Sequence, residues 1–82
     1  MPENEETYFR QAVAGARAFK ETEETESSLE WIDDLEGIAI NGSHEYMIKS
    51  LRELDRLAKS ENEEISAKAK EALELALELT KV

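Results

Sequence analysis

The most constraining feature of this sequence is the regular spacing of apolar residues near its C-terminal end. Apolar residues recur there at steps of 4, 3, 4 and 3 positions: Ile65, Ala69, Ala72, Ala76 and Leu79. This spacing places them on one face of an α-helix. Ser60 lies just upstream with Glu63 three residues later, which is the pattern of a capping box that satisfies free backbone N–H groups. We therefore expect a helix over residues 61–80.

The preceding segment predicts another helix, over residues 44–59. Ser43 is suited to the position that caps its N-terminus. Asn41 and Gly42 come just before, and this pair suits a left-handed end to the helix upstream. Because almost no residues separate this helix from the next one, the two are expected to form a tight hairpin.

A third helix is expected over residues 28–40. Ser27 and Glu30 have the spacing of a capping box, and apolar residues follow at helical intervals. Gly37 leaves two endings open, because the helix can stop there or continue to about Ile40.

The first helix is expected over residues 3–21, because proline at position 2 suits a first helical turn. Ala, Leu, Glu, Lys and Arg, all strong helix formers, make up 46 of the 82 residues. Val and Ile number only seven, and no stretch alternates polar and apolar residues for long. The sequence therefore predicts an all-α fold: one domain over residues 1–82, forming a compact four-helix bundle with a tight C-terminal helical hairpin.

The core of this bundle is expected to consist of large apolar residues: Phe9, Phe19, Leu29, Ile32, Leu35, Ile48, Leu51, Leu54, Ile65, Leu73 and Leu77. Gly15 lies among alanines, so it allows another helix to approach closely, with Gly37 as its counterpart. Alternatively, the missing side chains leave space for a small molecule. Arg10 and Arg17 share a helical face there and would hold either a ligand carboxylate or a neighbouring glutamate.

Charge and composition exclude several classes of function. The net charge is −10, and residues 1–42 alone carry 3 bases and 11 acids. This argues against a nucleic-acid or anionic-membrane partner, since both need clustered Lys and Arg. The chain begins with acidic residues and its longest apolar run is five residues, so we expect a soluble protein, cytoplasmic if it is natural or is made in an expression host.

No catalytic, cofactor or metal site is expected. Without cysteine and with one histidine, zinc would need carboxylates for most of its ligands. Taking Gly37 as the sixth position of a calcium loop leaves apolar Ile32 first and Ser43 twelfth, where acids are required. His44 follows a helix cap and is expected in solvent rather than in a catalytic triad, because no nucleophile motif accompanies it.

A protein-binding face is an alternative functional hypothesis that the residues suggest. Five residues define it: Tyr8, Trp31, Asp34, Leu35 and Tyr46. Trp and Tyr are common anchors of protein interfaces. The acids of residues 21–36 would steer a partner that has a basic rim. The competing interpretation places Trp31 in the core.

Residues 45–79 resemble the terminal helix pair of an armadillo or HEAT repeat. The resemblance rests on residues 60–65 followed by Ala69, Ala72 and Leu73. The asparagine that lines an armadillo peptide groove has no counterpart at the matching turn, where the residues are apolar or acidic. The resemblance therefore implies a helical hairpin and no peptide-groove function.

The chain also resembles de novo designed helical proteins. Glu outnumbers Asp by 17 to 3, and several pairs of opposite charge lie four residues apart: Glu6–Arg10, Glu45–Lys49, Asp55–Lys59 and Glu64–Lys68. Such pairs, together with deliberate caps, follow idealised design rules. This resemblance implies a scaffold without catalytic activity, which requires no partner and whose purpose is the fold itself. The alternatives are an interaction module using the Trp31 face and, less favoured, small-molecule binding at Gly15.

Overall fold

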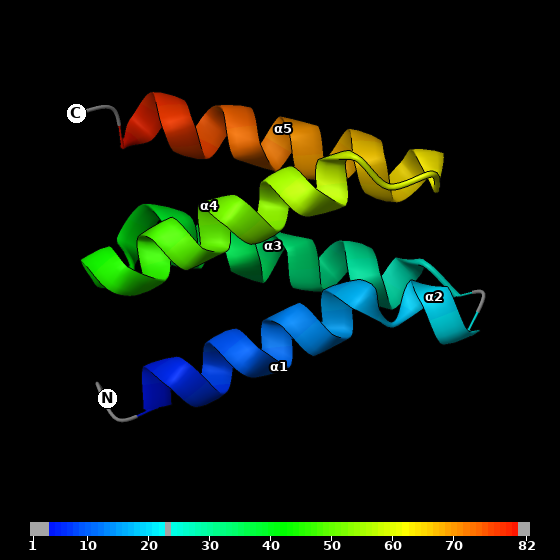
Figure 1. Cartoon of the computed structure of the whole chain (residues 1–82), viewed down its shortest axis with the longest axis horizontal. Helices are drawn as coiled ribbons and strands as arrows, with labels where there is room; N and C mark the ends of the chain where they lie inside the picture. Colours follow the sequence, from blue (N-terminus) through cyan, green and yellow to red (C-terminus); the bar gives the residue numbers. More distant parts are fainter. Residues whose placement is uncertain (1–3, 23, 81–82) are drawn as a thin grey trace.

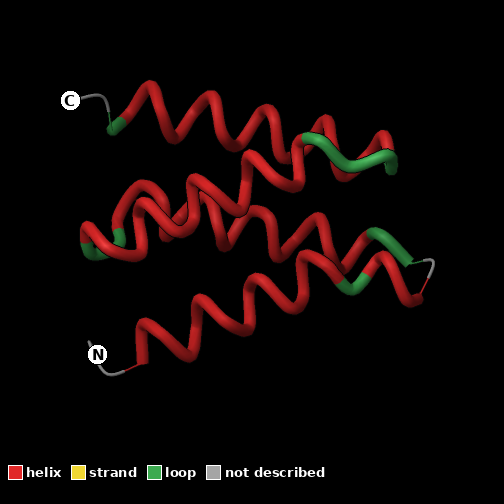
Figure 2. The backbone as a smooth tube through the Cα atoms, viewed as in Figure 1, coloured by secondary structure: helices red, strands yellow, loops and turns green. Residues whose placement is uncertain are grey.

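The computed structural model describes residues 4–22 and 24–80, and this part of the chain is helical without strands (Figures 1 and 2). Four long helices and one short helix follow one another: α1 (Glu5–Arg17), α2 (Phe19–Thr22), α3 (Glu26–Asn41), α4 (His44–Ala58) and α5 (Glu63–Leu79). The predicted all-α fold is confirmed.

The helices form a flat bundle, with Cα atoms spanning 33 × 26 × 15 Å. In Figure 1, α1 lies along one edge and α5 along the other, and α4 crosses in front of α3. The centre of the bundle is α3, which packs against α1, α4 and α5. The tight hairpin predicted at the C-terminal end is present, because α4 and α5 pack against each other after a short loop.

Much of the core consists of alanine rather than of large side chains. Buried apolar residues come from four helices: Ala12, Ala16, Ile32, Leu35, Ile38, Ala39, Leu54, Leu57, Ala58, Ile65, Ala69, Ala72 and Ala76. The helical spacing identified on α5 therefore marks its buried face, apart from its last member, Leu79, which is exposed. Small side chains let the helix backbones approach closely, which suits so thin a bundle.

Two residues predicted in the core lie at the surface instead. Ile48 of α4 is 36% exposed and Leu77 of α5 is 51% exposed. Both lie outside the rows of buried residues on their helices. Since α5 lies at the edge of the bundle, its neighbours cover only one side of it.

The break between α1 and α2 was not predicted, and Ser28 of α3 explains it. In a continuous helix the N–H of Phe19 would bond to the carbonyl of Gly15. The buried Ser28 hydroxyl stands between them: it accepts from Phe19 N at 3.1 Å and donates to Gly15 O at 2.9 Å. A side chain inserted into the hydrogen-bond ladder interrupts the helix at Ala18.

Both predicted capping boxes are wrong. α5 begins later than expected, with Asn62 as its cap: the Asn62 side chain accepts from Ile65 N at 3.1 Å. Ser60 instead accepts from Asn62 N in the preceding loop. α3 begins earlier than expected, at Glu26 with Thr25 in the cap position, so Ser27 already lies inside the helix.

The backbone between α3 and α4 does not have the left-handed conformation that was predicted for the end of α3. Helix α3 continues through Gly37 to Asn41, and Gly42 has an extended backbone with φ −75° and ψ 176°. Glycine is required there for space, because a Cβ atom would lie 2.6 Å from the carbonyl oxygen of Ile38. Ser43 occupies the expected cap position of α4 without a side-chain cap bond. Its backbone N–H donates to Glu5 Oε2 at 2.7 Å, which ties α1 to this turn.

Three of the four expected pairs of opposite charge along the helices are formed: Glu6–Arg10, Glu45–Lys49 and Asp55–Lys59. The fourth is wrong, since Lys68 Nζ lies 2.8 Å from Asp33 Oδ1 of α3 rather than beside Glu64. This hydrogen bond to Asp33 raises the pKa of Lys68. The pairing therefore joins α5 to α3 rather than two turns of α5.

Candidate functional site

The one deeply buried carboxylate in the described part of the chain belongs to Glu53 of α4. Its side chain is 4% exposed. Arg17 of α1 donates from Nε to Oε2 at 2.8 Å and from Nη2 to Oε1 at 2.7 Å. Arg56 donates to Oε1 at 2.9 Å. The bonds accepted by Glu53 raise the pKa of Arg17, and the ion pair clamps α1 to α4.

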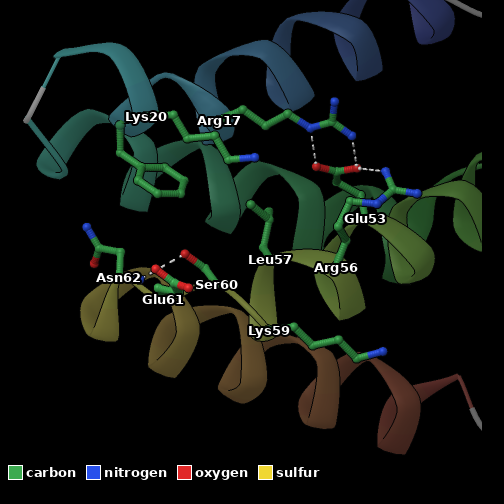
Figure 3. Close-up of a pocket in the computed structure, with 10 residues that line it drawn as sticks. Arg17, Lys20, Glu53, Arg56, Leu57, Lys59, Ser60, Glu61 and Asn62 are labelled. Atoms are coloured by element: carbon green, nitrogen blue, oxygen red, sulfur yellow. Dashed lines mark hydrogen bonds and ion pairs between the residues drawn. The ribbon is translucent and has the colours of Figure 1, made fainter.

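A cleft of about 400 Å³ opens beside this clamp, between the end of α1, α2 and the α4–α5 loop. Figure 3 shows Arg17, Glu53 and Arg56 joined at one end of the cleft and Asn62 at the other. Arg17 and Arg56 are engaged by Glu53, and Asn62 caps α5. The polar side chains of Arg17, Glu53, Arg56 and Asn62 in this cleft therefore already have hydrogen-bond partners within the protein.

A second depression, of about 340 Å³, lies between α1 and α3 and is acidic. Its lining includes Tyr8, Asp34, Asp33 and Gly37. The Tyr8 hydroxyl donates to Asp34 Oδ1 at 2.8 Å. Burial, followed by this hydrogen bond, raises the pKa of Tyr8. A Cβ atom on Gly37 would meet nothing within 4 Å, so the glycine leaves this wall open.

The structure brings together only part of the predicted protein-binding face. Tyr8 and Asp34 are hydrogen-bonded partners. Tyr46 lies elsewhere, with its ring centroid 5.5 Å from that of Phe9. Leu35 is fully buried and does not reach the surface. The depression beside Tyr8 is therefore the part of the predicted face that has a shaped surface.

Trp31 fills the space beside Gly15. A Cβ atom on Gly15 would lie 2.1 Å from Trp31 Cδ1, so the glycine accommodates the indole ring. The prediction that Gly37 is the counterpart of Gly15 is wrong. The group that packs on Gly15 is the Trp31 ring, and no described atom lies within 4 Å of the position that a Cβ atom on Gly37 would take. Trp31 is half-buried and packs against the core. The Trp31 side chain therefore packs against the core and is also partly exposed.

Of the remaining candidates, His44 and Arg10 line neither depression, whereas Arg17 lines the first cleft. His44 is an exposed residue at the start of α4. Arg10 pairs with Glu6 and Arg17 pairs with Glu53. Of the two expected alternatives, a ligand carboxylate or a glutamate of the chain, the structure has the glutamates. Among residues 4–22 and 24–80, no group of three or more His, Asp or Glu side chains is placed to hold a metal ion. No helix in this part is long and apolar enough to cross a membrane.

Two features of α4 were missed at the level of sequence. The first is the buried Glu53, which no local pattern distinguishes from the surface glutamates. The second is a basic stripe, formed by Lys49, Arg52, Arg56 and Lys59. Its steps of 3, 4 and 3 residues are readable in the sequence and place four cations on the exposed side of one helix.

Comparison with known proteins adds no relative: no family model matches the chain, and no curated protein or solved structure is significantly similar to it.

Proposed function

We propose that this chain is a helical scaffold of the de novo designed type, without catalytic activity, whose purpose is the fold itself. The observation that carries this proposal is the set of hydrogen bonds that the buried Glu53 carboxylate accepts. A buried carboxylate that served as a general acid or base would face a space for substrate. Glu53 lines a cleft, but both of its oxygens accept bonds from the protein's own arginines and are not directed at a free space.

The paired charges along the helices support the same proposal, because such pairs are a feature of idealised helical designs. Idealised proteins of this kind are typically hyperstable. We expect a thermal unfolding midpoint above about 90 °C by far-UV circular dichroism. A cooperative transition at about 45–65 °C, the range of ordinary mesophilic domains, would contradict the proposal.

The acidic depression between α1 and α3 favours a second candidate, a protein-interaction module. Tyr8 is exposed beside Asp33 and Asp34, so the surface combines an aromatic anchor with negative charge. Such a surface fits a Lys or Arg side chain from the basic rim of a partner. We do not extend the proposal to small-molecule binding at Gly15, since the Trp31 ring takes up that space.

Titration of ¹⁵N-labelled protein with an arginine-rich peptide tests this second candidate. The Gly37 amide lies in the depression and should shift, whereas the Gly15 amide should not. Asp34→Asn should weaken binding several-fold, and Asp55→Asn, which changes an exposed acid on α4, should leave it unchanged. Equal weakening by the two variants would show non-specific attraction to a protein of net charge −10 and would reject the site.

A further inference from the structure

The outer surface of the α4–α5 hairpin has an apolar groove, and within residues 4–22 and 24–80 its lining comes from these two helices and Lys59 alone. Leu51 of α4 and Leu73 and Leu77 of α5 line it, within an open depression of about 600 Å³. Leu77 is half exposed. Ile48, one helical turn before Leu51, is exposed on the same helix. Figure 1 shows this hairpin at one edge of the bundle.

The two sides of this groove carry opposite charges. The α4 side bears the basic stripe: Arg52, Arg56 and Lys59 line the groove together with one acid, Asp55, so this side carries a net positive charge. On α5, the side of the helix beyond Leu77 carries two exposed acids, Glu74 and Glu78, and one exposed base, Lys70. Across the hairpin, the net charge therefore changes from positive on the α4 side, through the apolar groove, to negative on the α5 side.

This order makes the surface complementary to itself. If two copies meet face to face about a two-fold axis parallel to the helices, the left and right sides of one copy are exchanged relative to the other. The basic side of α4 in each copy then lies over the acidic side of α5 in its partner, while the two apolar grooves meet at the centre. Two-fold symmetry of this kind is the commonest arrangement among oligomers.

We propose that the α4–α5 surface is a homodimer interface whose occupant is a second copy of this chain. The interface goes beyond the scaffold and the acidic depression proposed above, and it uses neither Tyr8 nor Asp34. A second copy offers both acids and exposed leucines on α5. By contrast, α3, the most acidic helix, has no large exposed apolar residue among those described, so it is a poorer match for an apolar groove.

Sedimentation equilibrium of the full chain, from micromolar to millimolar concentration, tests the proposal. We expect a reversible monomer–dimer equilibrium that weakens as salt rises, because charge pairs contribute to it. Leu77→Ser should weaken dimerisation at least about tenfold, as expected for a central apolar anchor. Leu75→Ser is the matched control: this leucine lies on the same helix and is 42% exposed, but it lines a different depression, beside Asp33 and Glu36.

A charge exchange separates this interface from simple hydrophobic association. Arg52→Glu alone and Glu74→Arg alone should each weaken the dimer, and the double variant should restore it to within a few-fold of the original protein. As a control, the circular dichroism spectrum of each variant should match that of the original protein, which checks that the variant is folded. A monomer at all concentrations, equal effects of Leu77→Ser and Leu75→Ser, or no restoration in the double variant would each overturn the proposal.

Discussion

Gly15 and Gly37 both lie inside helices, yet their surroundings predict opposite responses to the same substitution. A Cβ atom on Gly15 would lie 2.1 Å from Trp31 Cδ1, about 1.3 Å closer than the 3.4 Å at which ordinary contact begins. A Cβ atom on Gly37 would meet nothing within 4 Å. Gly15→Ala therefore has to displace the indole ring, whereas Gly37→Ala adds a methyl group at an open surface.

The magnitudes follow from two opposing contributions. Alanine stabilises a helix interior by about 1 kcal/mol relative to glycine, and this gain applies at both positions. At Gly15 it is opposed by overpacking, which costs about 1–3 kcal/mol, and by lost contacts of the displaced Trp31. We expect Gly37→Ala to raise the free energy of unfolding by about 1 kcal/mol and Gly15→Ala to lower it by about 1–2 kcal/mol.

Guanidinium denaturation followed by circular dichroism measures both changes, even if the protein does not melt below 90 °C. Trp31 is the only tryptophan, so its fluorescence reports the displacement directly. The folded Gly15→Ala protein should emit at longer wavelength, and the folded Gly37→Ala protein should emit like the original. A Gly15→Ala protein of unchanged or higher stability, with unshifted emission, would refute the packing of Trp31 on Gly15.

Three further predictions concern polar groups. The buried Ser50 hydroxyl has no hydrogen-bond partner among the residues that the structure describes, so Ser50→Ala should raise the unfolding free energy by about 1 kcal/mol. A decrease, measured by denaturation, would show that the hydroxyl does have a partner. Glu53→Met should be nearly neutral, because its two partly exposed arginine partners regain water. Arg17→Met should cost about 1–3 kcal/mol, because the buried Glu53 carboxylate then keeps only Arg56 as a partner. A larger loss of unfolding free energy in Glu53→Met than in Arg17→Met, measured by denaturation, would contradict this reasoning. Burial, followed by the charge of Asp33, raises the pKa of Glu36, so the folded state binds this proton more tightly than the unfolded state. Glu36→Gln should therefore be stabilising at pH 7, and the difference should vanish as the pH falls below about 4.5; a difference that persists at low pH would exclude titration as its cause.

Helical spacing was sufficient to predict the fold class and the C-terminal hairpin, because the buried face of α5 follows directly from the positions of Ile65, Ala69, Ala72 and Ala76. The caps were misplaced for a physical reason. In a chain with 17 glutamates, a serine is often followed three residues later by glutamate whether or not the two form a capping box. The core was overestimated at Ile48 and Leu77, because the sequence does not state how many sides of each helix its neighbours cover.

The candidate sites were less predictable, because they depend on contacts between helices. Tyr8 and Asp34 are 26 residues apart, and only the packing of α1 on α3 brings them together. Glu53 has the local surroundings of a surface residue, and its burial depends on Arg17, 36 residues away. The basic stripe of α4 is the exception, since it follows from helical periodicity alone.

The hydroxyl of Ser28 has a consequence for the direction of the chain after α1. Nothing within residues 4–22 requires a break at Ala18, because the segment contains no proline and Gly15 lies three residues earlier. Without the Ser28 hydroxyl, Phe19 N–H would be free to bond directly to the Gly15 carbonyl, as in a continuous helix. The direction of the polypeptide after α1 is therefore set by one side chain of α3 rather than by the sequence of the segment that bends.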